Sequence, residues 1–345
     1  MPLSFPRTGY FLCLLLCCTS LKTAAQLAHR LDSLLQADTP RAFNGVVLVE
    51  QKGRIIYYKA KGEANREKHI PLKKEDVFII GSLSKQITAV LVLQEMEKGH
   101  LHLTDTLHRL LPGLKAPWAD SITLEQLLTH TSGLGSPPDE AAPLLSRPGT
   151  EFHYSNYNFM LLAQVAAHTS GKLYEALVKD LFKRCGMKHS SPPRGYHGPL
   201  VTDYAEMPDG TWQVADNILE LAAPYGPSGA TISTAADLLR WNHCLHGGKL
   251  LQPATYQLMT SRHASRQGHR WGDVGYGFGV QVDSIGNIPE ISHNGNFAGF
   301  IATDIYLPQS VTSIIILENV NAQNQDRNRT FYYHDLIREW VRQQL

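Results

Sequence analysis

Hydrophobic residues recur at two different spacings along the chain, and these spacings predict where helices and strands lie. In Gln26–Gln36 the leucines recur at helical intervals, which predicts an amphipathic helix. Two β-rich runs then flank Lys52-Gly53, a pattern typical of a β-hairpin. A second helical pattern of apolar residues begins at Ser82 and continues to about Gly99.

The middle and the end of the chain differ in character. From about Leu103 to Asp237, helical stretches are separated by loops that contain Pro and Gly. The pattern of Arg329–Leu345 predicts a closing helix. Between these parts, four short runs are rich in Val, Ile, Phe and Tyr, as strands are: Tyr276–Val282, Ile288–Gly295, Gly299–Pro308 and Thr312–Asn319.

This order of elements predicts an α+β fold. We expect one antiparallel sheet, assembled from both ends of the chain and flanked by the N- and C-terminal helices, with a mainly helical domain inserted. The sheet part is expected at about residues 26–102 and 242–345, and the helical part at about 103–241. A cleft between two such parts is a common place for a site.

Residues 1–25 have the pattern of a signal peptide and are therefore set apart from the predicted fold. Arg7 supplies a positive start, Tyr10–Cys18 is apolar, and small residues precede a cleavage site after Ala25. The apolar stretch is too short to span a bilayer. We therefore expect an exported, periplasmic or secreted protein. Lipoprotein anchoring is less favoured, because bulky leucines precede Cys17 and Cys18.

Composition excludes some partners. The chain has 345 residues, of which 43% are hydrophobic and 18% charged, with a net charge of +1. This balance is that of a soluble globular protein and gives no reason to expect nucleic acid or an anionic membrane surface as a partner. Two cysteines lie outside the leader, Cys185 and Cys244. We expect two free buried thiols, although export would permit a disulfide.

Candidate chemistry begins at Ser82 and Lys85, which form a Ser-x-x-Lys motif. Positions i and i+3 share a helix face, so the amine can reach the hydroxyl. A lysine whose pKa is lowered by burial or by nearby cations can activate a serine nucleophile. The alternative is a capping serine followed by a solvated lysine.

Two further stretches offer polar groups for a cleft. Tyr154 and Asn156 supply a phenol and a carboxamide, which can relay a proton and hold a substrate. His293 is followed by Gly295, and the backbone N–H of Asn296 could complete an oxyanion hole with that of Ser82. The alternatives are a turn with a packed aromatic ring and a polar Asn-Gly hairpin turn.

The order and spacing of these three motifs resemble the family of class C serine β-lactamases, low-molecular-mass penicillin-binding proteins and related esterases. The resemblance runs from about Phe43 to Leu345. It includes three further stretches: Leu124–Leu134, Pro227–Trp241 and Tyr276–Val282. In that family the stretch that holds His130 is structural.

The resemblance implies a mechanism without metal or organic cofactor. Ser82 would attack an amide, ester or β-lactam carbonyl, and Lys85 and Tyr154 would share the role of general base. Asn156 would hold the substrate and His293 would contact its leaving part or a carboxylate. The oxyanion would bind the N–H groups of Ser82 and Asn296, beside Gly295.

The third motif departs from the class C pattern, which has Lys and Thr where this chain has His293 and Asn294. Histidine is mostly neutral at pH 7 and supplies no permanent cation. This difference favours a carboxylesterase, a D-alanyl-D-alanine carboxypeptidase or a D-aminopeptidase over an efficient β-lactamase. A penicillin-binding-like ligand sensor is the non-enzymatic alternative.

Overall fold

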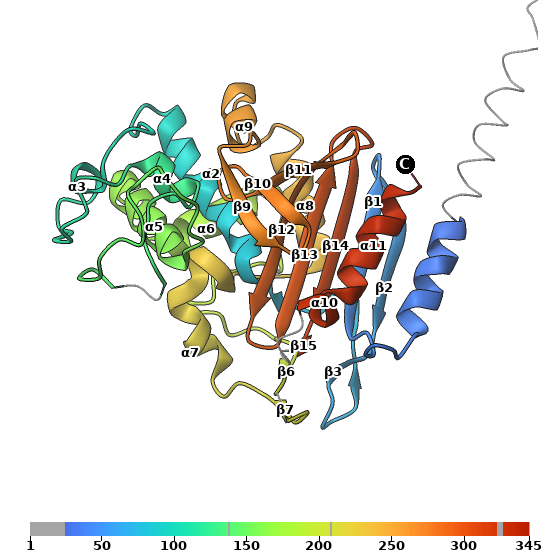
Figure 1. Cartoon of the computed structure of the whole chain (residues 1–345). Coiled ribbons are helices and arrows are strands. Elements are labelled where there is room, and N and C mark those ends of the chain that lie inside the picture. The colour runs from blue at the N-terminus through green and yellow to red at the C-terminus, as the bar shows by residue number, and fades with distance from the viewer. Residues whose placement is uncertain (1–24, 137–138, 208, 323–326, 345) are drawn as a thin grey trace, which may run out of the picture.

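The computed structural model describes residues 25–136, 139–207, 209–322 and 327–344. The predicted signal peptide, apart from Ala25, lies outside these residues. An eight-stranded antiparallel sheet forms the centre, in the order β2-β1-β14-β13-β12-β11-β10-β9 (Figure 1). Its strands are β1 (Gly45–Gln51), β2 (Arg54–Lys61), β9 (Ala264–His269), β10 (Gly272–Tyr276), β11 (Gln281–Ile285), β12 (Ile288–Phe297), β13 (Phe300–Leu307) and β14 (Thr312–Glu318). The sheet therefore joins both ends of the chain, as predicted.

The central strands are buried on both faces, and alternation sorts their side chains between two cores. In β1, Val46 and Leu48 join one core whereas Val47 and Val49 join the other, because successive side chains point to opposite faces of a sheet. A helix at residues 25–36 and α11 (Tyr332–Arg342) cover the second face (Figure 1). Both terminal helices are thus confirmed.

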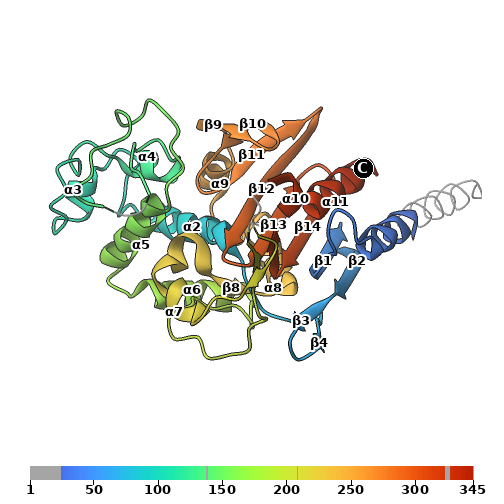
Figure 2. The ribbon, with the colours of Figure 1, turned by 60° about the horizontal axis from the view of Figure 1, so that its bottom comes forward.

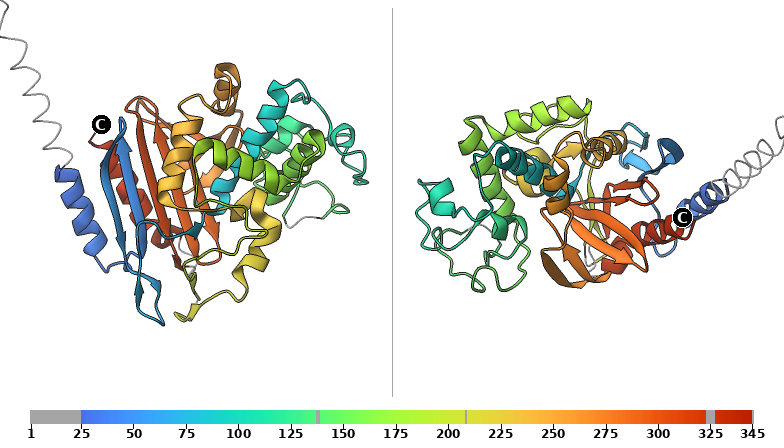
Figure 3. Two further views of the ribbon diagram at one scale, coloured as in Figure 1. Left: turned by 180° about the vertical axis from the view of Figure 1, so that it is seen from behind. Right: turned by 90° about the horizontal axis from the view of Figure 1, so that it is seen from above.

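The remaining helices lie on the other side of the sheet, where Figures 2 and 3 show them gathered. They are α2 (Ser84–Glu97), α3 (Leu107–Leu110), α4 (Leu124–Leu128), α5 (Asn156–Ser170), α6 (Tyr174–Cys185), α7 (Ile218–Ala222), α8 (Ala235–Leu245) and α9 (Pro253–Met259). A short helix, α10 (Arg327–Thr330), precedes α11. Helix α8 extends across the predicted boundary at residue 241, and it packs on the sheet strands β1 and β14. The division into two parts stays a prediction.

Short strands and turns tie these layers together. The minor strands are β3 (Glu63–Asn65), β4 (Ile70–Pro71), β5 (Phe78–Ile79), β6 (Tyr204–Glu206), β7 (Trp212–Gln213), β8 (Ile232–Ser233) and β15 (Val320–Ala322). A 3-10 turn at Gly81–Leu83 precedes α2, and the π-helical segment Gly226–Ala230 contacts both that turn and α2. The antiparallel pair β5–β8 holds the chain just before the 3-10 turn.

One expectation about the strands was wrong in detail, and one strand was not predicted. Tyr276–Val282 is not one strand, because β10 ends at Tyr276 and β11 begins at Gln281. A tight turn lies between them, in which Gly279 has a φ of +72°, a conformation that favours glycine. The edge strand β9 was not predicted, since its sequence is polar and has no apolar alternation.

Cys185 and Cys244, the cysteines outside the predicted leader, are buried free thiols, as expected. Cys185 ends α6 and Cys244 lies in α8, and these helices contact each other. Burial and the neighbouring Cys244 thiol raise the pKa of Cys185. The Cys185 thiol therefore stays protonated within the core.

Candidate active site

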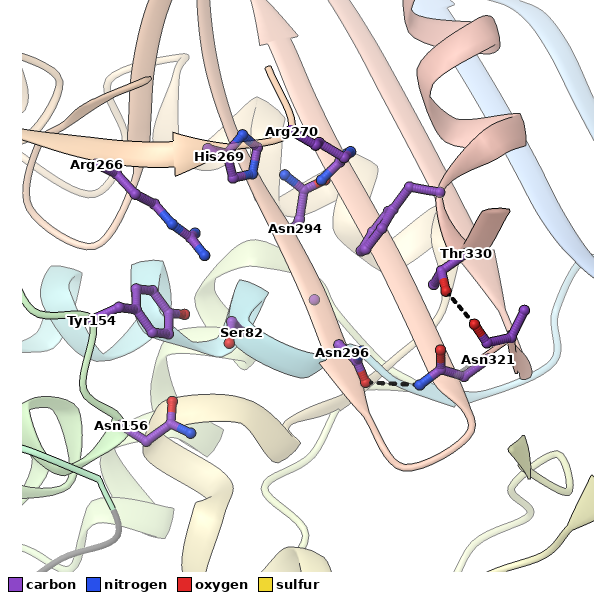
Figure 4. A pocket seen from close by; sticks show the side chains of 13 residues that line it. Ser82, Tyr154, Asn156, Arg266, His269, Arg270, Asn294, Asn296, Asn321 and Thr330 are labelled. Carbon is purple, nitrogen blue, oxygen red and sulfur yellow. Dashed lines mark hydrogen bonds between the residues drawn. The ribbon is translucent and has the colours of Figure 1, made fainter. Parts of the chain in front are cut away.

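A cavity of about 710 Å³ lies where the sheet meets the helical layer (Figure 4). It brings together side chains from the start of α2, from α5, from β9 and from β12, which are distant in the sequence. The lining residues are Ser82, Tyr154, Asn156, Arg266, His269, Arg270, Asn294, Gly295, Asn296, Asn321, Ala322, Thr330 and Phe331. Five of the seven predicted site residues line it, and the other two, Lys85 and His293, lie behind its wall.

Ser82 is held by a turn that requires glycine on both sides of the contact. Gly81 has a φ of +56°, and a Cβ there would lie 2.4 Å from the backbone nitrogen of Asn296. A Cβ on Gly295 would lie 2.1 Å from the carbonyl oxygen of Ile80. Because real Cβ atoms do not approach so closely, only glycines let β12 lie against this turn. The backbones that carry Ser82 and Asn296 are thereby brought together.

Lys85 is fully buried beneath this turn, with 0% exposure. Its Nζ lies 3.1 Å from Ser82 Oγ, 2.7 Å from Asn156 Oδ1 and 2.5 Å from the carbonyl oxygen of Ser228. Burial, and secondarily the charge of Arg266, hold the pKa of Lys85 well below its usual value. A neutral amine has two N–H groups, and these can donate hydrogen bonds to Asn156 Oδ1 and to the carbonyl oxygen of Ser228. Its lone pair is then available to the Ser82 hydroxyl.

Tyr154 and Asn156 come from the start of α5. Ser155 caps the helix, since its Oγ accepts from the N–H of Tyr157 at 3.2 Å. The Tyr154 ring lies 4.7 Å from Lys85 Nζ. Burial raises the pKa of Tyr154 to about 12, although Arg266 and a hydrogen bond with Ser82 act in the opposite direction. The phenol is therefore protonated at neutral pH and can donate a proton.

His130 holds the segment that carries Tyr154. Its carbonyl accepts from the N–H of His153 at 2.8 Å, and its Nδ1 accepts from the N–H of Ser155 at 3.2 Å and from Asn158 Nδ2 at 3.0 Å. The imidazole ring also lies 4.3 Å from the Tyr154 ring. Because Nδ1 accepts, the proton is on Nε2, and burial keeps the pKa of His130 well below its usual value.

His293 is placed differently from what its motif position suggests. The side chain is 1% exposed. Its Nδ1 donates to the carbonyl oxygen of Asn294 at 2.8 Å, and its Nε2 lies 3.1 Å from the Tyr276 hydroxyl. Burial is the largest cause that lowers the pKa of His293 well below the usual value. The imidazole is therefore neutral and fully hydrogen-bonded inside the wall.

The cavity contains two arginines that sequence reasoning missed. Arg266 extends from β9 toward Tyr154 and Ser82 (Figure 4), and its Cζ lies 4.7 Å from the centre of the Tyr154 ring. Arg270 pairs with Asp335 at 3.0 Å and donates to Asn294 Oδ1 at 2.9 Å. No sequence signal marks either residue, because the edge strand that carries Arg266 reads as a polar loop.

Other kinds of site receive no support from the geometry. Within the described ranges, no group of three or more His, Cys, Asp or Glu side chains is placed to hold a metal ion. The same ranges contain no helix with the length and apolar character needed to cross a membrane.

Comparison with known proteins agrees with this geometry. The family model named Beta-lactamase matches residues 31–339. The chain belongs to the beta-lactamase family. The predicted assignment to this group of serine hydrolases is therefore confirmed, and with it the predicted α+β fold.

Relatives of this beta-lactamase family member have several different names. A penicillin-binding protein of Bacillus subtilis (strain 168) is 27% identical over 321 residues, which cover 80% of this chain and 68% of the relative. A teichoic acid D-alanine hydrolase of Staphylococcus aureus is 24% identical over 338 residues, which cover 90% and 78%. The solved structure of D-amino acid amidase from Ochrobactrum anthropi SV3 has the same fold. It matches with a TM-score of 0.78 at 19% identity, over 93% of this chain and 100% of that one.

Proposed function

We propose that this protein hydrolyses ester or amide bonds through an acyl-enzyme formed on Ser82. The observation that carries the proposal is the buried Lys85 amine, 3.1 Å from Ser82 Oγ and without a carboxylate partner among the described residues. A buried lysine in such surroundings is a suitable base for a serine nucleophile. A cap followed by a solvated lysine does not fit a side chain with 0% exposure.

Acylation follows from the positions of these groups. Lys85 Nζ accepts the proton of the Ser82 hydroxyl while Oγ forms a bond to the substrate carbonyl carbon. The carbonyl oxygen becomes an oxyanion, and the N–H groups of Ser82 and Asn296 stabilise it. Tyr154 then passes a proton to the leaving group as the bond to that group breaks. Lys85 returns the proton to Tyr154, and Asn156 holds the substrate through its amide.

Deacylation uses the same groups in reverse. Tyr154 first gives its proton to the neutral Lys85 amine, and its phenolate oxygen then takes a proton from water as the water oxygen bonds to the acyl carbon. The bond to Ser82 Oγ then breaks, and Oγ regains a proton from Lys85. The products are a carboxylic acid and the free enzyme.

The state of His293 favours an esterase or a D-amino-acid peptidase over an efficient β-lactamase. A motif lysine would be a permanent cation facing the substrate, whereas this imidazole is neutral and 1% exposed. Among the relatives, the names D-amino acid amidase and teichoic acid D-alanine hydrolase support acyl substrates that are not β-lactams. We further propose export, on the pattern of residues 1–25.

The experiment compares turnover of a p-nitrophenyl ester and of a chromogenic cephalosporin, with Ser82→Ala as the blank. We expect Ser82-dependent ester turnover and little cephalosporin turnover. Intact mass after treatment with a fluorophosphonate probe should show one adduct on the wild type. An equal adduct on Ser82→Ala would contradict the proposal. Binding of penicillin with no Ser82-dependent turnover of any substrate would favour the ligand sensor.

A further inference from the structure

The cavity has a cation in an unexpected place. In this family's third motif the side chain at position 293 is expected to meet the substrate, but here both imidazole nitrogens of His293 are engaged, by Tyr276 and by the carbonyl of Asn294. The ring has no nitrogen left for a substrate group. An anion in the cavity must therefore be met by another residue.

Arg266 is the side chain placed to do this. It is partly buried, it lines the cavity, and its guanidinium lies 4.7 Å from the Tyr154 ring centre. Within the described part of the chain its side chain has neither an ion pair nor a hydrogen bond. Arg270, by contrast, is paired with Asp335. Arg266 thus keeps all five guanidinium N–H donors for a ligand.

The other residues that line the cavity also favour a negatively charged ligand. The described residues that line the cavity include no Asp and no Glu. Arg266 is also close enough to lower the pKa of Lys85 and to oppose the rise in the pKa of Tyr154. A cleft lined by one sign of charge concentrates ligands of the opposite sign. A guanidinium binds a carboxylate or a phosphate through two parallel hydrogen bonds.

The position of Arg266 also indicates which part of the substrate carries the anion. In the proposed reaction, Tyr154 protonates the leaving group, and the guanidinium lies over that phenol ring (Figure 4). A substituent on the leaving group is therefore the one that lies nearest to Arg266. The acyl part is bonded to Ser82 Oγ in the intermediate and stays at the serine.

We propose that Arg266 determines specificity by binding a carboxylate or phosphate on the leaving group of the substrate. This inference rests on the proposed acyl-enzyme chemistry at Ser82. It assigns to β9 the recognition that the third motif would otherwise supply. The preferred substrates are then acyl esters or amides whose leaving group bears a negative charge.

The test uses three aryl esters with one acyl group and different leaving groups: phenol, 3-hydroxybenzoate and 3-hydroxyphenyl phosphate. The measured quantity is kcat/KM for each charged ester divided by kcat/KM for the phenol ester. We expect this ratio to exceed that of uncatalysed hydrolysis about ten-fold or more in the wild type, the range of a charge-assisted hydrogen bond. The larger of the two ratios identifies carboxylate or phosphate as the preferred anion.

Arg266→Met should lower the ratio about ten-fold or more toward the uncatalysed value. The matched control is Arg262→Met, which removes an exposed arginine just before β9 and should keep the wild-type ratio. A ratio that Arg266→Met leaves unchanged would overturn the proposal, as would a ratio that falls only in His293→Asn. If instead the phenol ester shows no Ser82-dependent turnover, the proposed function itself has failed.

Discussion

Replacement of Lys85 by Met tests whether the buried amine is neutral in the folded protein. Burial and the nearby Arg266 hold its pKa well below the usual value. In the unfolded chain the amine is solvated and has a pKa of about 10.4. Between these two pKa values, the unfolded state therefore binds one proton more than the folded state.

The sign and size of the effect follow from this difference. One additional proton on the unfolded state changes the free energy of unfolding by about +1.4 kcal/mol per pH unit. The pKa of Lys85 is lower in the folded state than in the unfolded state. Its effect on stability is therefore most unfavourable below the folded-state pKa and disappears above the unfolded-state pKa. Met binds no proton. As the pH rises from the lowered folded-state pKa toward about 10.4, the wild type should therefore gain about 1.4 kcal/mol per pH unit relative to Lys85→Met.

The assay is urea denaturation of both proteins at several pH values, with the difference in unfolding free energy plotted against pH. Other titrating groups contribute to both proteins and largely cancel. Exposed Lys179→Met is the matched control for removal of a lysine. A difference for Lys85→Met that does not change with pH would mean that the folded protein keeps the proton on Lys85. The amine could not then accept a proton from Ser82.

Three further changes test the framework around the site. Gly81→Ala should lower kcat/KM about 100-fold, because the new Cβ would displace β12, and steady-state ester hydrolysis measures it. Arg41→Met leaves the buried Glu318 carboxylate without its guanidinium, and urea denaturation should show a loss of about 3–5 kcal/mol. His130→Asn keeps a residue that tolerates the φ of +59° but removes the ring beside Tyr154. The substitution should lower kcat more than it changes KM. A kcat equal to that of the wild type would exclude a positioning role for His130.

The sheet could be predicted from the sequence wherever burial leaves a pattern. The apolar strands β1, β13 and β14 are buried over most of their length, so their composition identifies them. The strongly amphipathic α11 was equally clear, because one of its faces packs on the sheet and the other meets solvent. These elements are specified by contacts with the core.

The parts of the site that could not be predicted from the sequence depend on long-range contacts, which leave no local pattern. The strand β9 is an edge strand with polar residues, so nothing in its sequence distinguishes it from a loop. The role of Arg266 depends on Tyr154, which comes from a different layer of the fold. The burial of His293 depends on its contact with the Tyr276 hydroxyl across the sheet. Motif spacing indicated which residues belong to the site, but not which of them face the cavity.

The site separates its base from its permanent charge, and desolvation accounts for this separation. Burial is the largest cause that lowers the pKa values of Lys85, His130 and His293, so all three groups are driven toward the neutral form. A permanent cation buried beside Lys85 would itself carry a large desolvation cost. A guanidinium that enters from the edge strand remains partly solvated and still lies over Tyr154. It can therefore assist the phenol and attract an anion, while the amine beneath Ser82 keeps the lone pair that a general base requires.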